Sequence, residues 1–218
     1  MAVIHSTIFR VKPGRLEDML SMTLESLKVH ERLDVRTGRL MTAAVAGEAS
    51  GVFAFSTEFT DVEAYATFAD EAARDHEMQT LFARAQAADS PVVLEQQSLA
   101  TEIPLGRTPR TGRGTVLEIH VTRPTPGRFD ETLAMAGRVA ELVERHGARN
   151  ARVFQLGYAG ICSGMLMSSW ECDSVRAWAK VSAAWQTDPE GQAIAATLTA
   201  ASPTSTLVFS GLYNEVPV

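Results

Sequence analysis

Alternating apolar and polar positions open both halves of the chain. Residues 3–11 and 116–123 alternate in this way and are rich in β-forming residues, so each predicts a strand. A Pro-Gly pair breaks each strand, and apolar residues then recur at helical spacing. In the first half these are Leu16, Leu20, Leu24 and Leu27, and in the second Phe129, Leu133, Ala140 and Val143. Each half therefore begins with a strand followed by a helix.

The rest of each half carries the same signals in the same order. Hairpins are predicted over 39–45 with 51–59 and over 152–158 with 164–172, each around a glycine-bearing turn. N-caps of two later helical segments are expected at Asp61 and Asp75, and at Asp173 or Ser174 and Asp188. Closing strands are predicted over 91–103 and 204–216. Each half thus reads β-α-β-β-α-β, the ferredoxin-like pattern.

The two halves are also similar in sequence. A shift of 113 residues aligns residues 3–104 with 116–217 without a gap, so that Pro13-Gly14-Arg15 returns as Pro126-Gly127-Arg128. Solenoid periods run from about 20 to 50 residues, so a period this long is a small domain. The sequence predicts a tandem duplication, with domains at 1–105 and 115–218 joined by a linker at 106–114.

A ferredoxin-like unit has both helices on one face of its sheet and leaves the other face bare. The economical cover for that face is the sheet of the second copy. The predicted fold class is therefore α+β, with two ferredoxin-like repeats packed sheet to sheet as a pseudo-dimeric α+β barrel. Sheet edges need protection, so a homodimer of the fused chain is left open.

Composition and charge narrow the class of partner. The net charge of −6 argues against a nucleic-acid partner. Arg107, Arg110 and Arg113 cluster in the linker, where we expect a solvated segment, with an anion or partner contact as the alternative. No apolar run reaches the ~18 residues of a membrane span, and no secretory signal opens the chain. Cys162 and Cys172 favour free thiols and a cytoplasmic location, although pairing across the hairpin is left open.

One segment of each half, together with the order of elements, resembles the dimeric α+β barrel superfamily. These segments are Glu58-Phe59-Thr60-Asp61-Val62-Glu63-Ala64-Tyr65 and Ser169-Trp170-Glu171-Cys172-Asp173-Ser174-Val175-Arg176-Ala177-Trp178. The superfamily includes antibiotic-biosynthesis-type monooxygenases, NIPSNAP-like proteins, muconolactone isomerases and haem enzymes. The turn Asp188-Pro189-Glu190-Gly191-Gln192 is similar to the start of a late helical turn in NIPSNAP-like members.

The resemblance implies one of two functions. The first is a cofactor-independent monooxygenase or isomerase acting on a small aromatic or polyketide-like molecule. The second is a non-catalytic, NIPSNAP-like structural or interaction protein. Haem-binding members use a helix histidine, which would make His76 the candidate ligand, but nothing else in the sequence favours haem. The histidines and carboxylates show no metal-ligand spacing, so we expect neither a metal nor a cofactor.

Polar residues on the first strands are the candidate catalytic groups. Leu117, Ile119 and Val121 share one strand face and are expected to pack under the helices. Glu118 and His120 would then point into the barrel, with His120 as a proton acceptor. A polar strand end, or a hydrogen-bonded interior pair, is the alternative interpretation.

The other candidates are expected to line a ligand site. His5 and Thr7 are predicted to face the barrel from the first strand, and Trp170, Tyr158 and Tyr213 to supply aromatic wall. We expect one pocket for a small apolar or aromatic molecule, lined by the second repeat and placed between sheet and helices or inside the barrel. His30 and His146 are expected at surface C-terminal ends of helices.

Overall fold

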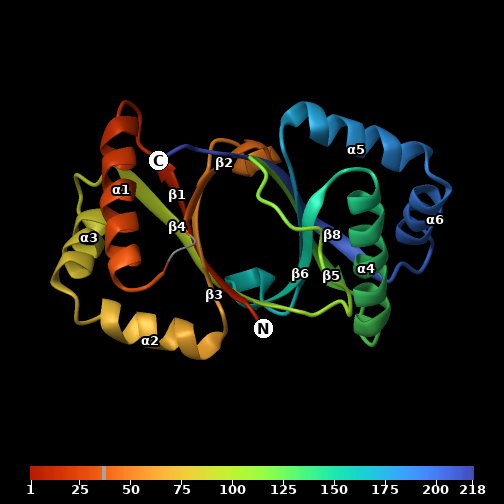
Figure 1. The fold of residues 1–218 in the computed structure, drawn as a ribbon, viewed down its shortest axis with the longest axis horizontal. Coiled ribbons are helices and arrows are strands. Elements are labelled where there is room, and N and C mark those ends of the chain that lie inside the picture. Colours follow the sequence, from red (N-terminus) through yellow and green to blue (C-terminus); the bar gives the residue numbers. More distant parts are fainter. Residues whose placement is uncertain (36–37) are drawn as a thin grey trace.

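The computed structural model describes residues 1–35 and 38–218, and the same order of elements occurs in both halves (Figure 1). The first half contains β1 (Val3–Val11), α1 (Leu16–Arg32), β2 (Arg39–Val45), β3 (Phe53–Phe59), α2 (Val62–Ala72), α3 (His76–Gln86) and β4 (Val92–Glu102). The second contains β5 (Val116–Pro124), α4 (Phe129–Arg145), β6 (Arg149–Tyr158), β7 (Leu166–Cys172), α5 (Val175–Thr187), α6 (Pro189–Leu198) and β8 (Ser205–Glu215). Short 3-10 turns, η1 (Gly47–Ala49) and η2 (Gly160–Cys162), join the hairpin strands.

The predicted N-caps set where four of these helices begin. Asp61 and Asp75 accept hydrogen bonds from the backbone N–H groups of α2 and α3, and Asp188 does the same for α6. At α5 the cap is Ser174, which accepts from Ala177 N, rather than Asp173. Each cap satisfies one of the free N–H groups at a helix start, so short polar signals fix helix positions on the sheet.

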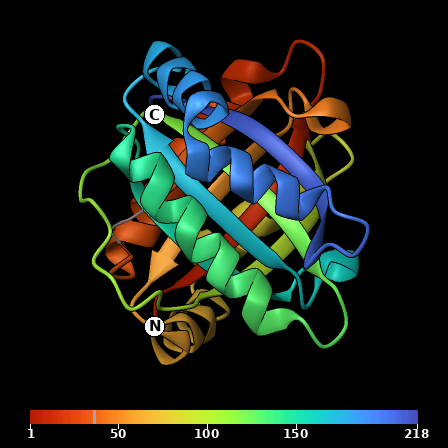
Figure 2. The ribbon, with the colours of Figure 1, turned by 90° about the vertical axis from the view of Figure 1, so that its right-hand side faces the viewer.

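The two sheets join along their edges into one closed barrel, which confirms the predicted α+β barrel. The strand order is β1-β3-β2-β8-β5-β7-β6-β4. β2 pairs antiparallel with β8, and β4 pairs antiparallel with β6, so hydrogen bonds link the halves at two seams. The helices lie outside, with α4, α5 and α6 crossing the outer face of the second half's strands (Figure 2).

The inner face of the barrel carries the residues that were expected under the helices. Leu117 and Ile119 pack with Met41 and Tyr213 inside the barrel, and Ile8 joins them from β1. The predicted strand facing is therefore wrong in both halves. The physical reason is that the helices cover the outer face while the barrel closes the inner one, so both faces bear apolar residues. Alternation alone then cannot tell inside from outside.

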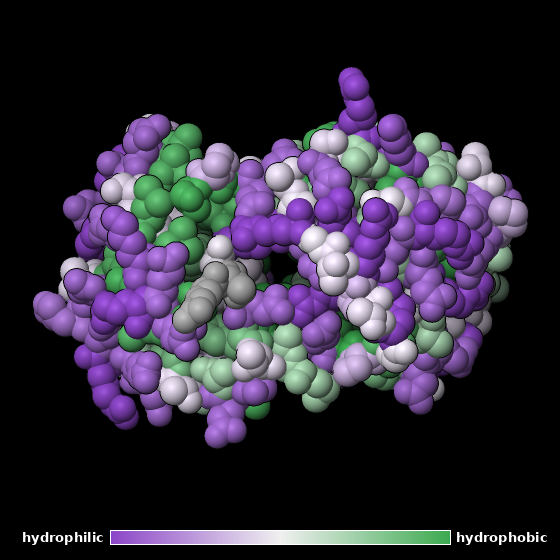
Figure 3. Space-filling model, viewed as in Figure 1, coloured by the Kyte–Doolittle hydropathy of each residue, from purple (hydrophilic) through white to green (hydrophobic). Residues whose placement is uncertain are grey.

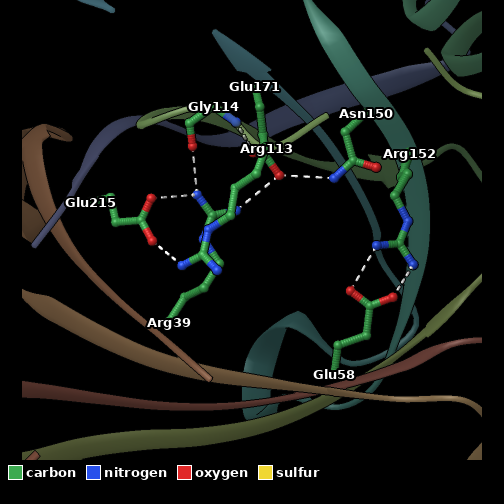
Figure 4. Close-up of polar contacts among 8 residues, drawn as sticks. All are labelled: Arg39, Glu58, Arg113, Gly114, Asn150, Arg152, Glu171 and Glu215. Carbon is green, nitrogen blue, oxygen red and sulfur yellow. Dashed lines mark hydrogen bonds and ion pairs between the residues drawn. The ribbon is translucent and has the colours of Figure 1, made fainter. Parts of the chain in front are cut away.

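A ring of ion pairs at one mouth of the barrel connects the halves reciprocally (Figure 4). Arg39 of β2 pairs with Glu171 at 2.9 Å and with Glu215 at 3.3 Å. The residues 113 positions away form the equivalent ion pairs, from an arginine of the second half to two glutamates of the first. Arg152 of β6 pairs with Glu58 at 2.7 Å and with Glu102 at 2.8 Å. Mutual exchange of this kind is the signature of a twofold interface.

Burial gives these pairs a larger role than surface ion pairs have. The Arg152 side chain is 11% exposed and that of Arg39 is 17% exposed. Burial disfavours the charge of Arg152, but hydrogen bonds to Glu102 and Glu58 outweigh it, and the pKa of the guanidinium is raised. Its guanidinium also lies 4.9 Å from the ring centre of Phe154. Arg152 is therefore held charged at the seam between the two sheets.

The segment between the halves is anchored rather than freely solvated. Arg107 is half-buried and donates to Glu144 at 2.6 Å and to the carbonyl of Ala151 at 2.8 Å. Arg113 forms an ion pair with Glu215, at the mouth of the barrel. The expectation of a solvated linker is therefore wrong for Arg107, because a carboxylate of α4 lies within its reach, whereas Arg113 stays exposed while it pairs with Glu215. Across the described residues, no helix is long and apolar enough to cross a membrane.

Replacing Arg152 with Ala is expected to destabilise the fold by about 2 kcal/mol, because Glu58 and Glu102 lose their shared partner in a half-buried setting. Chemical denaturation measures the free energy of unfolding. The exposed Arg176, changed to Ala, is the control and is expected to have little effect. Equal stability of the two variants would show that the ring does not hold the halves together.

Candidate functional site

Three hydrogen-bond donors converge on the carboxylate of Glu118, between β5 and α5. The indole Nε1 of Trp170 donates to Glu118 Oε2 at 2.9 Å, and that of Trp178 donates to the same oxygen at 2.8 Å. His120 Nε2 lies 2.9 Å from Glu118 Oε1. Glu118 and His120 therefore point toward the helix layer, and the prediction that they point into the barrel is wrong. The helix side offers indole donors, whereas the interior at this point is apolar.

The pairing with Glu118 decides which nitrogen of His120 carries the proton. An ionised carboxylate can only accept, so Nε2 is the donor in this contact. Nδ1 is then left with its lone pair available. The His120 ring also stacks on Trp170, with ring centres 5.0 Å apart and planes 18° apart. Its side chain is 26% exposed, so the imidazole is both held in one orientation and reachable from solvent.

Local structure places each member of this cluster. Glu118 and His120 share a face because they are two residues apart on one strand. Trp170 stands directly opposite Glu118 in the pairing of β5 with β7. Trp178 lies one turn into α5, where its backbone N–H donates to the backbone carbonyl of the cap residue Ser174 at 2.9 Å. The cap thus sets the rotation of α5 that brings the second indole over β5.

The first half has a different set of residues at the equivalent place. His5 corresponds to Glu118, and it too lies on the helix side, 5.7 Å from the ring centre of Tyr65. Thr7 shares this outer face, so the expectation that His5 and Thr7 face the barrel is wrong for the same reason as on β5. Thr57, opposite His5, is 1% exposed, and its hydroxyl has no hydrogen-bond partner among the described residues.

His30 belongs to the same outer layer and is not a surface residue. It is 7% exposed, and its ring packs against Phe55 and Phe68 with centres 5.3 and 4.9 Å apart. Its Nδ1 lies 2.7 Å from the carbonyl of Ser26, which fixes Nδ1 as the protonated nitrogen. The surface expectation fails because α1 turns this residue onto the sheet. His146 does cap the end of α4, with Nε2 2.9 Å from Asp188.

The aromatic candidates separate into different parts of the molecule. Trp170 joins Glu118, as described above. Tyr158 lies at the end of β6, and its side chain is exposed (76%). Tyr213 is 8% exposed inside the barrel, where burial raises the pKa of its phenol to about 12. The candidates therefore do not form one pocket: Glu118, His120 and Trp170 lie together in the second half, whereas His5 and Thr7 lie on the outer face of the first half.

Neither thiol nor haem chemistry finds support. Cys162 and Cys172 are both free, and burial raises the pKa of the Cys172 thiol to about 11, which keeps it protonated. His76, the first residue of α3, is exposed and lines neither of the two depressions described below. Its setting does not fit an axial ligand. Within the described ranges, no group of three His, Cys, Asp or Glu side chains could hold a metal ion.

Two surface depressions lie away from the Glu118 cluster. One, of about 300 Å³, lies between the end of α1 and the C-terminal residues Val216–Val218, next to Arg39 and Arg113. The other, of about 160 Å³, lies beside the linker at Leu105 and Arg107. Neither includes Glu118 or His120.

Sequence reasoning missed one member of the cluster. Trp178 falls at a helix position typical of core residues, and only the fold shows that its N–H reaches Glu118. A usable signal did exist, since tryptophans occur only in the second half and a buried indole N–H needs an acceptor. Glu118, already grouped with His120, is the carboxylate that could have been considered as that acceptor.

Comparison with known proteins places the fold. No family model matches the chain, and no curated protein matches it in sequence. Among solved structures, a "Putative monooxygenase" from Fusobacterium nucleatum has a TM-score of 0.63 at 7% identity, covering 99% of this chain and 93% of that one. An anthrone oxidase-like protein has a TM-score of 0.56 at 15% identity, covering 99% and 92%.

A mutant chlorite dismutase from Candidatus Nitrospira defluvii has a TM-score of 0.55 at 7% identity, covering 99% of this chain and 91% of that one. At identities this low, the likeness shows the fold alone. The chain shares its ferredoxin-like α+β barrel with proteins described as monooxygenases and chlorite dismutases.

Two histidines of the first half, the buried His30 and the half-buried His5, make stability depend on pH. Burial lowers the pKa of both His5 and His30 below 6.5, and the charge of His30 lowers that of His5 further. Below pH 6.5 the unfolded chain binds more protons than the folded one, so stability is full above that pH and falls as the pH drops toward the folded pKa values. Replacing His30 with Val, the residue that α4 has at the equivalent position, is expected to flatten this fall.

The free energy of unfolding, measured between pH 7.5 and pH 5, checks this expectation. His76→Ala serves as the control, because that ring is exposed. An unchanged slope in the His30→Val variant would contradict the assignment of a neutral, buried imidazole.

Proposed function

We propose that the chain binds a small aromatic molecule beside the Glu118 cluster and that His120 removes a proton from it, as a cofactor-independent monooxygenase or isomerase. The observation that carries this proposal is the pair of contacts on either side of His120. Glu118 holds Nε2, and Trp170 holds the ring face. An imidazole fixed in one tautomer by a carboxylate, with its other nitrogen free, is the arrangement of a general base.

The proposed chemistry needs a substrate with an acidic C–H group. Anthrone, named in the description of one similar structure, has a CH₂ flanked by two aromatic rings. His120 Nδ1 takes one proton from this carbon, and the carbanion passes electrons to O₂ to form a hydroperoxide at the same carbon. Loss of water then leaves a ketone. One anthrone and one O₂ give one anthraquinone and one water, so no external reductant is required.

A non-catalytic role, of the NIPSNAP-like structural or interaction kind, is the second candidate. It is favoured by the hydrogen bonds of Glu118, whose two carboxylate oxygens already accept from three donors within the chain. A buried carboxylate that satisfies two indole N–H groups can be retained for packing alone. The position of both surface depressions away from His120 favours the same interpretation.

The domain organisation also belongs to the proposal. Residues 1–105 and 115–218 are two copies of one duplicated domain, joined by the linker at 106–114. Support comes from the ion-pair ring, in which Arg39 and Arg152 stand 113 positions apart, as do Glu58 and Glu171. A homodimeric ancestor that became fused would leave this reciprocal pattern.

Oxygen uptake with anthrone tests the catalytic proposal. The wild-type chain is expected to consume O₂ and produce anthraquinone. His120→Ala is expected to reduce turnover about 100-fold or more, because the proton acceptor is lost. Glu118→Gln is expected to reduce it less, because the amide still contacts the imidazole but no longer stabilises its charged form.

The matched control is His146→Ala, which removes an imidazole–carboxylate contact of the same length outside the Glu118 cluster. Circular dichroism verifies that each variant is folded. If His120→Ala and His146→Ala retain equal turnover, His120 is not the base. If wild type consumes no O₂ with anthrone, the proposed oxygenation of this substrate class is wrong.

Self-association of the fused chain is part of the proposal as well, because closure of the barrel leaves two stretches of edge. Residues 92–98 pair only with β1, and residues 205–211 pair only with β5, in the described strand pairings. These stretches carry exposed Val93, Leu94, Leu207 and Val208, which are 39–56% exposed. Open edges with apolar side chains favour pairing with another chain.

A homodimer held in this way is expected to dissociate when Leu207 is changed to Lys, since a charge on an edge strand opposes pairing. Sedimentation velocity measures the oligomeric state. The control is Val62→Lys, which places the same charge at an exposed helix start. A monomer at all concentrations in the wild type would remove this part of the proposal.

A further inference from the structure

We infer that the interior of the barrel is a second binding site, for a small, uncharged, mainly apolar molecule that carries one hydroxyl or carbonyl group. This site is distinct from the Glu118 cluster, which lies on the outer face of the sheet. It does not depend on the proposed catalytic function.

The inner wall of the first half carries a central patch of small side chains, between Ile4 and Ile8 of β1. Ser6 is paired with Ser56 on β3 and with Ser98 on β4, and the inward Ala54 and Ala100 are paired with Ile8 and Ile4. The equivalent positions of the second half include larger residues, namely Ile119, Met167 and Tyr213. An eight-stranded barrel is wide enough to be filled by side chains or to hold one small ligand. The small residues therefore leave volume on one side.

The large residues of the second half pack with the isoleucines at the two ends of this patch, since Ile119 and Phe209 belong to one cluster with Ile4 and to another with Ile8. A Cβ atom at Gly211 would lie 2.7 Å from the ring of Phe209 and 2.8 Å from the ring of Tyr213. Atoms of both rings therefore lie directly beside Gly211, and any side chain at this position would displace them. Glycine thus lets the two rings stay next to their own strand, β8.

Accessibility along the barrel agrees with an unfilled interior. Ile4, Ser6, Ile8 and Ile119 point inward from the middle of closed strands, yet they are half-buried rather than buried. The inward apolar residues form two separate clusters that share only Ile119 and Phe209. Figure 3, seen in the same direction as Figure 1, shows a hollow between the two halves, with hydrophilic residues beside it.

The chemistry of the walls defines the class of ligand. Ser6 and Ser56 exchange a hydrogen bond of 2.8 Å, and one of the two hydroxyls in such a pair keeps a donor for another acceptor. Ser98 lies next to Ser6 on the other side. Facing them are Ile119, Phe209 and the phenol of Tyr213. An apolar molecule with one polar group matches these surfaces.

The mouth of the barrel disfavours charged ligands. Arg39 and Arg152 are already paired with four carboxylates, and Arg113 pairs with one of these, Glu215. Three guanidinium groups thus face four carboxylates, and each of these side chains already takes part in an ion pair within the ring. An uncharged molecule can enter without breaking an ion pair.

The test uses 2-naphthol and naphthalene as probes, with binding measured by equilibrium dialysis. The wild-type chain is expected to bind 2-naphthol about fivefold more tightly than naphthalene, the increment of one neutral hydrogen bond. Ala54→Leu fills the interior and is expected to abolish binding of both. The conservative Ala54→Ser is expected to retain it. Ser6→Ala combined with Ser56→Ala is expected to remove the preference for 2-naphthol.

The Glu118 cluster could also take an aromatic probe, so His120→Ala is measured alongside. Binding lost in His120→Ala and retained in Ala54→Leu would overturn the interior site and support the outer one. Binding lost in Ala54→Leu and retained in His120→Ala supports the interior site, whatever the fate of the proposed catalysis.

Thiol labelling covers the case in which Ala54→Leu does not fold. Ser56→Cys places a thiol on the inner wall, and a small methanethiosulfonate reagent is expected to modify it in the folded chain. Saturating 2-naphthol is expected to protect it. The wild-type chain gives the background from Cys162 and Cys172. A Ser56→Cys thiol that reacts only after unfolding would show a filled interior and overturn the inference.

Discussion

The reciprocal pairing of Arg39 and Arg152 with carboxylates of the opposite half is the interaction on which the rest of the structure depends. These six side chains occupy inward positions on six different strands, and each contact crosses from one half to the other. Half-buried charges must be matched closely, because an unmatched one is costly. The ring therefore favours one registration of the two sheets. That registration in turn fixes where the outer faces, and hence the helices, lie.

The order of elements and most of their boundaries could be predicted from the sequence, because local rules determine them. Pro-Gly breaks, N-cap side chains and strand alternation act within a few residues. Asp75 and Asp188, for example, cap α3 and α6 by accepting hydrogen bonds from backbone N–H groups two or three residues further on. The direction in which each strand faces could not be predicted, because Leu117 and Val116 are both apolar and both are covered. Only the closure of the barrel decides which of them is enclosed by strands and which by helices.

The candidate site was predicted in part for the same reason. Glu118, His120 and Trp170 could be grouped because they lie on neighbouring strands. Trp178 could not, because its contact with Glu118 depends on the rotation of α5 over the sheet. Tyr158 is exposed because β6 ends at this residue, and Tyr213 is buried because its side of β8 faces the interior of the barrel. The offset of 113 residues also relates each arginine and glutamate of the ion-pair ring to its counterpart in the other half, as Arg39 to Arg152.

The presence of both halves in one chain has a consequence for the symmetry of the molecule. In an assembly of two identical subunits every substitution occurs twice, so a change that suits one side must be tolerated on the other. In the fused chain, a substitution changes one half and leaves the other half as it was. His5 and Glu118 occupy matching places, yet the first half holds His5 beside Tyr65 and His30 among phenylalanines, and the second half holds a carboxylate between two indoles. One half is thus free to specialise while its counterpart keeps the barrel closed.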